Sequence, residues 1–164
     1  MREAMKAIPE GFHSVTPTIT VPTGKGNEAM DFYKKALGAE ELMRMPGPDG
    51  KGVMHGEIKI GNSILFIGEE FPRPDSPKSP KTLGGVTNTF YVYVQDSDTA
   101  FKKAVDAGGK VTMPIADTFW GDRAGSIIDP FGHMWMIGTR KKDLTPEEMG
   151  KAAQEFYAQM ASKQ

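Results

Sequence analysis

The two halves of the chain repeat one order of predicted elements, and this repeat limits the possible folds more than any other feature of the sequence. Three short segments of the first half have counterparts in the second half, in the same order along the chain. Ordered matches of this kind favour a duplication over chance. The counterparts are Tyr33–Ala36 with Phe101–Ala104, Gly61 with Gly132, and Val21 with Val94.

The first half is predicted to run strand, helix and three strands. Polar and apolar residues alternate in its first segment, which is typical of a strand. Met30, Tyr33 and Leu37 keep helical spacing after Asn27, which we expect to cap the helix, and Gly38 is expected to end it. The predicted elements are a strand over 13–21, a helix over 28–37, and strands around 40–45, 52–60 and 63–68.

The second half is predicted to repeat this order after a proline-rich segment. Four prolines between residues 69 and 85 prevent regular strand pairing, so this segment is predicted to be a linker or a lid. Asp96 or Ser97 is expected to cap the second helix, and Asp129–Gly132 is expected to form a tight turn. The predicted elements are a strand over 86–94, a helix over 97–107, and strands around 110–115, 121–129 and 133–140.

These patterns predict an α+β fold of tandem βαβββ modules with a C-terminal helix. Pro146 and the acidic residues beside it predict that last helix, which carries an apolar stripe to pack on the body or on a partner subunit. A helix on one face of each sheet leaves the other faces free to curl around a cleft. The predicted segments are an N-terminal arm (1–11), the first module (12–70), a Pro-rich linker (71–84), the second module (85–142) and the C-terminal helix (143–164).

Charge and composition exclude several classes of partner. The formal net charge is -1 and the basic residues are scattered in short pairs, so we expect no nucleic-acid partner. The absence of cysteine excludes disulfides and thiolate chemistry. No apolar run approaches the ~20 residues that span a bilayer, and the N-terminus lacks the apolar core of a signal peptide. We therefore expect a cytoplasmic protein that binds no membrane.

Strand parity predicts which side chains line the cleft. They are threonines from the first strand, a polar pair from the third strand, and aromatic and methionine side chains from the second half. An apolar, aromatic cleft with a few polar groups is typical of a small-molecule site. The predicted ligand-binding residues are Thr16, Thr18, His55, Glu57, Tyr91, Trp120, Arg123, Met134 and Met136.

Two groups of polar residues have both a functional and a structural interpretation. His55 and Glu57 lie two apart on a predicted strand, so they face the same side and are candidates for acid–base catalysis. Their other interpretation is a hydrogen-bonded pair that lines a polar pocket, in which Glu57 fixes the tautomer of His55. Arg123 could hold an anionic ligand group or form an ion pair with Asp122 or Asp129.

Three further residues also have two interpretations. Trp120 could stack on a flat ligand beside Arg123. Tyr91 could contact the ligand through its hydroxyl group or simply pack within the sheet. His133, which follows a turn glycine, could be a metal ligand or a structural hydrogen-bonding group.

Several motifs lie in register with the predicted modules, namely Glu28–Ala39, Val53–Gly61, Trp120–Gly125, Asp129–Trp135 and the tail Leu144–Met149. Together they resemble the vicinal-oxygen-chelate superfamily, which groups glyoxalase I, bleomycin-resistance proteins and extradiol dioxygenases, and within it the PhnB-like branch. The resemblance covers about Phe12 to Met149. It implies the tandem βαβββ fold and a homodimer with shared or swapped modules.

Enzymes of this superfamily hold a divalent metal with His, Glu or Gln from the first and last strands of each module. The resemblance places those positions on Thr16, Leu65, Thr89 and Met136. Threonine is a poor ligand, leucine is none, and a thioether is too soft for Mg²⁺, Mn²⁺ or Fe²⁺. We therefore predict no metal and no other cofactor.

The resulting prediction is metal-independent binding of a small, partly aromatic or amphipathic molecule, as in the drug-sequestering branch. The alternative is a metal-dependent lyase, isomerase or dioxygenase that uses an atypical metal site, or an enzyme that uses His55 and Glu57. A third interpretation is a structural or regulatory protein whose cleft is filled by its own side chains. Whether the chain is an enzyme stays open at this point.

Overall fold

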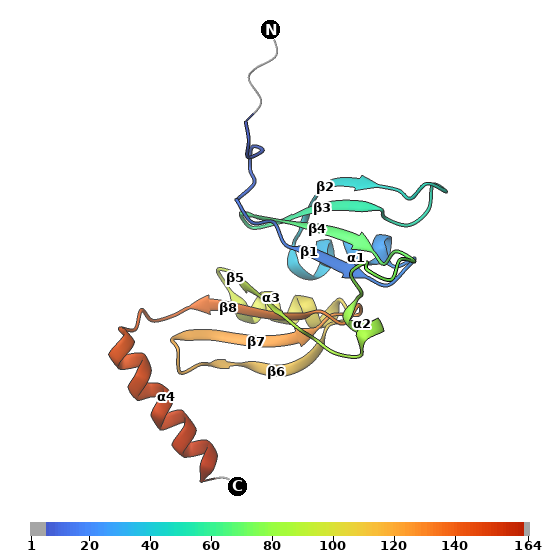
Figure 1. The fold of residues 1–164 in the computed structure, drawn as a ribbon. Coiled ribbons are helices and arrows are strands. Elements are labelled where there is room, and N and C mark those ends of the chain that lie inside the picture. The colour runs from blue at the N-terminus through green and yellow to red at the C-terminus, as the bar shows by residue number, and fades with distance from the viewer. Residues whose placement is uncertain (1–5, 163–164) are drawn as a thin grey trace. The chain divides into compact units, whose positions relative to one another are not determined.

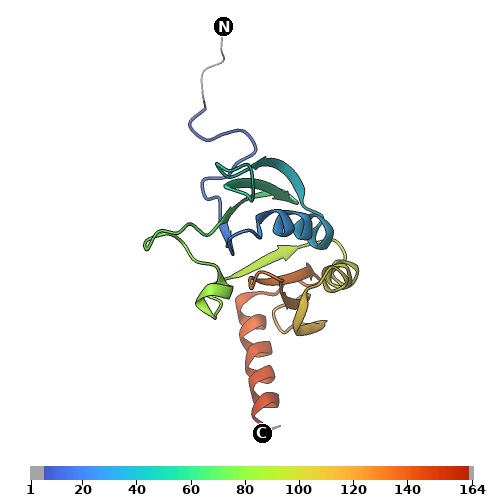
Figure 2. The same cartoon turned by 90° about the vertical axis from the view of Figure 1, so that its right-hand side faces the viewer.

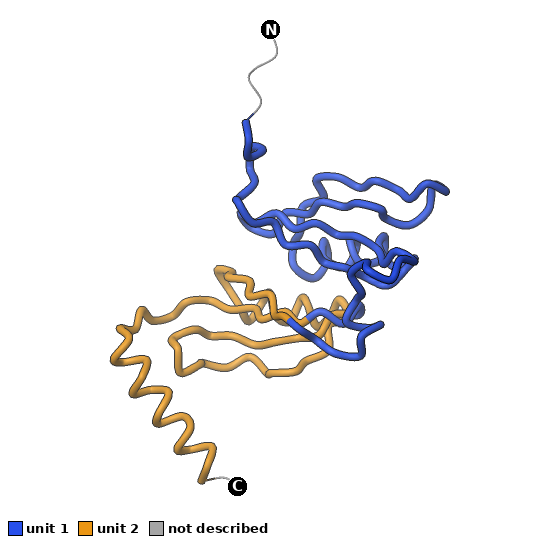
Figure 3. Tube along the Cα trace, in the orientation of Figure 1, with its two compact units in different colours: residues 1–87, 130–133 blue, residues 88–129, 134–164 orange. Residues whose placement is uncertain are grey.

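The computed structural model describes residues 6–162, and the chain forms two compact units (Figure 3). Unit 1 comprises Met1–Thr87 with Pro130–His133, and unit 2 comprises Asn88–Asp129 with Met134–Gln164. The first five residues of the predicted N-terminal arm and the last two of the C-terminal segment lie outside the described part of the chain.

Unit 1 is one mixed sheet with a helix on one of its faces (Figure 1). Its elements are β1 (Thr18–Val21), α1 (Gly26–Leu37), β2 (Glu40–Met45), β3 (His55–Ile60), β4 (Ser63–Glu69) and the short α2 (Pro80–Leu83). The strand order is β1-β4-β3-β2. Strand β1 is parallel to β4, and the other pairs are antiparallel.

Unit 2 repeats this topology. Its elements are β5 (Thr89–Tyr93), α3 (Ser97–Asp106), β6 (Lys110–Asp117), β7 (Asp122–Ile128), β8 (Met134–Arg140) and α4 (Pro146–Ala161). The strand order is β5-β8-β7-β6, with β5 parallel to β8. The predicted tandem βαβββ fold with a C-terminal helix is therefore confirmed.

The start of α1 differs from the prediction. Asn27 does not cap the helix; its side chain accepts a hydrogen bond from Arg44 at 2.9 Å. The carboxylate of Glu69, at the end of β4, instead accepts from the backbone N–H of Gly24 at 2.7 Å and of Gly26 at 2.9 Å. The same carboxylate accepts from the N–H of Val53 at 2.9 Å. An acidic side chain that is distant in sequence thus accepts the hydrogen bonds of the free N–H groups at the helix N-terminus. Its negative charge is favourable there.

Other boundaries shift for local reasons. Strand β1 begins at Thr18 because Pro17 has no N–H to donate, although the Pro17 carbonyl still accepts from Phe66 N–H at 2.9 Å. The predicted Pro-rich linker contains one helical turn, α2, which the sequence analysis missed. Ser79 caps α2 by accepting from Thr82 N–H, and Pro80 follows at the first helical position.

Helix α4 matches its predicted position but is poorly covered. Thr145 and Glu148 form a complete capping box at its start. The helix extends away from the sheet of its own unit (Figures 1 and 2), and none of its residues is buried. The ring of Phe119 lies 5.2 Å from that of Phe156 and 6.2 Å from that of Tyr157. Over residues 6–162, no helix has the length and apolar character needed to cross a bilayer.

The predicted Asp-Pro-Phe-Gly turn supplies core residues to unit 1. The Phe131 side chain is 4% exposed, and its ring lies 6.0 Å from that of Phe32 and 6.2 Å from that of Tyr33. Gly132 has a φ of 97°, and a Cβ there would lie 3.1 Å from Pro80. This turn therefore needs glycine both for its backbone conformation and for its close packing.

Replacing Phe131 with alanine should lower the free energy of unfolding by about 3–5 kcal/mol, because it leaves a cavity among aromatic rings. Urea denaturation followed by near-ultraviolet circular dichroism would measure this loss. Phe71, which is 47% exposed, provides the control, since Phe71→Ala should cost less than about 1 kcal/mol. Equal losses in the two variants would show that Phe131 is not a core residue.

Candidate functional site

Each unit has a sheet face that points away from its own helix, and we call this its open face. In unit 1, the Glu69 side chain at the end of β4 contacts the start of α1. Side chains at alternate positions of a strand share one face, so Leu65 and Ile67 also face α1. Leu65 is accordingly 6% exposed and Ile67 is fully buried. The open face of unit 1 carries Thr18, Thr20, Met43, Met45, His55, Glu57 and Phe66.

In unit 2, alternate residues of β7 face α3. Arg123 binds Asp98 of that helix, and a Cβ added at Gly125 would lie 2.7 Å from Phe101 of the same helix. The opposite parity of the strands forms the open face. Its residues include Tyr91, Tyr93, Asp122, Ser126, Met134, Met136 and Arg140.

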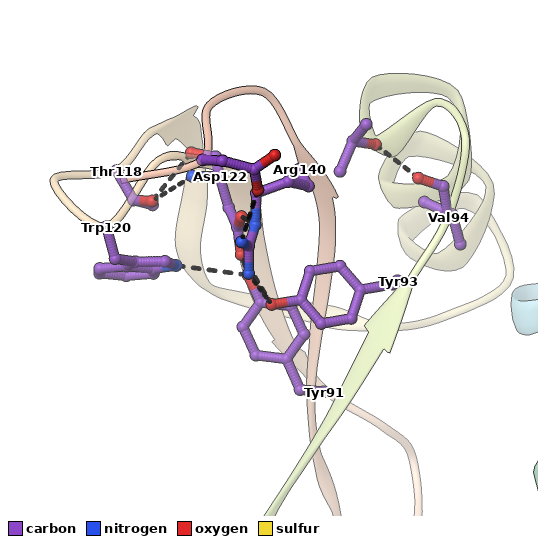
Figure 4. Close-up of polar contacts among 9 residues, drawn as sticks. Tyr91, Tyr93, Val94, Thr118, Trp120, Asp122 and Arg140 are labelled. Carbon is purple, nitrogen blue, oxygen red and sulfur yellow. Dashed lines mark hydrogen bonds and ion pairs between the residues drawn. The ribbon is translucent and has the colours of Figure 1, made fainter. Parts of the chain in front are cut away.

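The open face of unit 2 is organised around the carboxylate of Asp122, whose side chain is 0% exposed (Figure 4). It accepts hydrogen bonds from the Tyr91 hydroxyl at 2.6 Å, the Tyr93 hydroxyl at 3.1 Å and Arg140 Nε at 2.8 Å. Trp120 Nε1 donates to the Tyr91 oxygen at 3.5 Å. We call Tyr91, Tyr93, Trp120, Asp122 and Arg140 the Asp122 cluster.

A glycine makes this cluster possible. Tyr91 lies on β5 and Asp122 on β7, with β8 between them. A Cβ at Gly138 of β8 would lie 2.6 Å from the Tyr91 hydroxyl. The bare backbone of Gly138 therefore lets the Tyr91 ring cross the intervening strand and reach the carboxylate.

The cluster fixes the protonation states of its members. Burial would raise the pKa of Asp122, but the hydrogen bonds from Tyr91, Tyr93 and Arg140 outweigh it and lower that pKa below its ordinary value. Burial and the hydrogen bond to Asp122 both raise the pKa of Tyr91. Asp122 is consequently ionised and Tyr91 is a neutral phenol at neutral pH. This arrangement can hold and orient a polar ligand group, but it does not provide a tyrosinate base.

The remaining predicted residues of unit 2 are divided between the two faces. Arg123 lies on the α3 side, where it binds Asp98 at 2.6 Å and Asp117 at 3.2 Å. The predicted ion-pair partner Asp122 binds Arg140 instead. Met134 and Met136 lie half-buried on the open face. The sequence analysis missed Arg140, although its strand parity with Met136 could have indicated it.

In unit 1, the structure brings His55 and Glu57 together. His55 Nε2 lies 3.0 Å from a Glu57 carboxylate oxygen, and the ring of Phe66 lies 4.8 Å from the imidazole. Thr18 lies on the same face, while Thr16 precedes β1 and is half-buried. His133, also in unit 1, forms a hydrogen bond with the Thr20 carbonyl at 2.9 Å, which agrees with its structural interpretation.

The strand register tests whether the donor set suits the metal of the resembled family. Thr18 pairs with Phe66 in unit 1, and Tyr91 pairs with Met136 in unit 2. Val21 corresponds to Val94 in the repeat, so Thr18 corresponds to Tyr91. Their pairing partners, Phe66 and Met136, therefore correspond to each other, which corrects the predicted counterpart Leu65. These phenyl, phenol, hydroxyl and thioether groups do not fit a hard divalent metal. Within the described residues, no three or more His, Cys, Asp or Glu side chains are gathered as metal ligands.

Two sheets of βαβββ order, each with a helix on one face, define a tandem βαβββ protein. The model of the Glyoxalase/Bleomycin resistance protein/Dioxygenase superfamily matches residues 15–137. The chain belongs to this superfamily, as its motifs predicted.

Several known proteins are similar to this chain in sequence or in fold. An uncharacterized protein of Mycobacterium bovis is 39% identical over 126 residues, which cover 76% of this chain and 82% of the relative. The structure of a gene product of Arabidopsis thaliana has a TM-score of 0.62 and 28% identity, and the match covers 77% of this chain and 98% of that one. A PhnB protein from Bacillus cereus shares the fold, with a TM-score of 0.60, 18% identity and coverage of 77% and 99%.

Replacing Asp122 with asparagine should lower the free energy of unfolding at pH 7 by about 1–3 kcal/mol, because Tyr91, Tyr93 and Arg140 lose the charged group of their buried acceptor. The folded-state pKa of Asp122 lies below its ordinary value of 3.8. The native carboxylate therefore stabilises the fold above pH 3.8, and this contribution is lost as the pH falls through the folded-state value. Denaturation curves recorded across this acid range should show a smaller pH dependence in Asp122→Asn.

The control for this prediction is Asp143→Asn. Asp143 also binds Arg140, at 3.2 Å, but its side chain is 95% exposed. Its replacement should cost less than about 1 kcal/mol. An unchanged acid dependence in Asp122→Asn, matching that of the control, would contradict the proposed charge state.

Proposed function

We propose that this chain binds a small, partly aromatic or amphipathic molecule through the open face of unit 2, without the usual divalent metal of its superfamily. The Asp122 cluster is the observation that carries this proposal. It combines aromatic side chains with polar groups that a buried carboxylate holds in place. Such a combination of apolar walls and a few fixed polar groups is typical of ligand sites.

The aromatic side chains of the cluster remain available to a ligand. Tyr91 is 37% exposed and Tyr93 is 57% exposed, although their hydroxyl groups bind a buried carboxylate. Their rings lie 4.7 Å apart. Met134 and Met136 lie on the same face, and flexible thioethers adapt to irregular apolar ligands. A flat ligand could therefore stack on rigid rings beside adaptable methionines.

The guanidinium of Arg140 is placed to bind an anionic group of such a ligand. Its guanidinium is anchored by Asp122 through Nε and lies over the Tyr93 ring, 5.8 Å from the ring centroid. The side chain is nevertheless 51% exposed, so part of the guanidinium can still donate hydrogen bonds outward. We assign Arg140 the orienting role that the sequence analysis gave to Arg123.

The second candidate function is enzymatic and rests on the His55–Glu57 pair. A histidine held 3.0 Å from a carboxylate on an open sheet face is arranged for acid–base chemistry or for part of an atypical metal site. This candidate predicts that activity or metal binding depends on His55. The first candidate predicts binding that depends on the Asp122 cluster.

Protein treated with EDTA should still bind naphthalene-2-carboxylate or quinoxaline, as measured by isothermal titration calorimetry. Replacing Tyr93 or Trp120 with leucine should weaken binding about 2- to 10-fold, because each replacement removes an aromatic contact. The control is Phe71→Leu, which removes an aromatic side chain that is 47% exposed and lies outside both the cluster and α4.

Two results would contradict the proposed function. One is that neither aromatic probe binds. The other is that binding is lost with EDTA, is restored by one equivalent of a divalent ion, and disappears in His55→Ala. The second result would favour the second candidate, because it would show an atypical metal site that includes His55.

We further propose that the chain forms a homodimer through α4. Phe156 is 42% exposed, Tyr157 62% and Met160 51%, and a helix of this length is only marginally stable without packing. Light scattering should give twice the chain mass of 17.9 kDa. Phe156→Glu should shift this mass toward the monomer, whereas Gln154→Glu, with the same charge change on the same helix, should not. A monomeric native chain would contradict the proposal.

A further inference from the structure

Two methionines of an edge strand lie on the open face of unit 1. Met43 and Met45 are separated by one residue on β2, so their side chains point to the same side of the sheet. Strand β2 is an edge of its sheet, because it pairs only with β3 there. Met43 is 43% exposed and Met45 is 42% exposed. Both methionine side chains are therefore partly exposed to solvent.

A histidine lies directly across the strand pair from these methionines. Met45 is the register partner of His55, and Met43 is the register partner of Glu57. Side chains of directly opposed residues on antiparallel strands start from Cβ atoms only about 4.5–5.5 Å apart. Two thioethers and one imidazole thus extend from neighbouring positions on one face of the sheet.

The hydrogen bond of His55 resembles that of a metal-binding histidine. Its Nε2 lies 3.0 Å from a Glu57 carboxylate oxygen, and the neutral tautomer that donates from Nε2 to this oxygen has a free lone pair on Nδ1. Histidines that bind metals almost always donate their other N–H to such a partner. The Phe66 ring, 4.8 Å from the imidazole, limits its orientations further.

The chemistry of these donors selects a particular class of ion. Thioethers are soft ligands that favour Cu(I), whereas Mg²⁺, Ca²⁺ and Mn²⁺ prefer oxygen ligands. We propose that Met43, Met45 and His55 Nδ1 form a binding site for a soft monovalent cation, Cu(I) or its redox-stable analogue Ag(I). Glu57 is a positioning residue for His55. This site is separate from the Asp122 cluster and requires no organic ligand.

The experiment is a titration of the full chain with Ag(I), and with Cu(I) under anaerobic conditions in competition with a chromogenic chelator. One equivalent should bind, and the methyl resonances of Met43 and Met45 should shift together with those of the His55 ring. Met45→Leu keeps the side-chain size but removes the sulfur, so it should weaken binding by at least about tenfold. The control is Met113→Leu, since Met113 lies on β6 of unit 2, away from the proposed ion site.

Glu57→Gln separates positioning from structural support. This substitution should weaken Ag(I) binding about 10- to 100-fold. It should also change the tautomer ratio of His55, which the ¹⁵N chemical shifts of the imidazole ring report. The thermal unfolding midpoint should stay close to that of the native chain. The proposal is overturned if Met43→Leu/Met45→Leu binds Ag(I) as tightly as the native chain does. It is also overturned if Zn²⁺ displaces Ag(I) at equal concentration, because a thioether site should prefer the softer ion.

Discussion

The parity of side chains along the strands is the constraint on which both units depend. Because each helix covers one face of its sheet, every strand residue is assigned either to the core or to the open face. Glu57 and Phe66 are open-face neighbours in unit 1, while Ser126 and Met136 hold the same register positions in unit 2. The duplicated framework thus keeps one topology while its two open faces carry different chemistry.

The two open faces use carboxylates in different ways. In unit 2, Asp122 is buried and its charge is balanced by Arg140 and two phenols, so it acts as a fixed anchor for aromatic rings. In unit 1, Glu57 holds an imidazole on an accessible surface. Burial of a charge requires several partners, whereas a partly exposed pair needs only one. The open face of unit 2 is therefore mainly aromatic, whereas that of unit 1 carries an imidazole and two thioethers.

Sequence patterns predicted the elements well because periodicity and turn residues act over a few positions. Gly38 ends α1, Asp96 caps α3 and Thr145 precedes α4, as expected from local chemistry. The cap of α1 could not be predicted in this way, since its acceptor comes from β4. Arg140 was missed for a similar reason, because its importance depends on a buried partner on a neighbouring strand. Local signals identify elements, while charged partners are chosen by the folded arrangement.

The Glu69 carboxylate has a consequence for how unit 1 assembles. Glu69 lies 43 residues after Gly26 in the sequence, and its carboxylate accepts a hydrogen bond from the Gly26 N–H. It also accepts a hydrogen bond from the N–H of Val53, just before β3. Helix α1 therefore gains its N-terminal partner only after the chain has closed a long loop and added its last strand. Contacts of such sequence separation form late and slow the folding of a domain. One acidic side chain thus links the start of the helix to the last strand of the sheet, so we expect the two to form together.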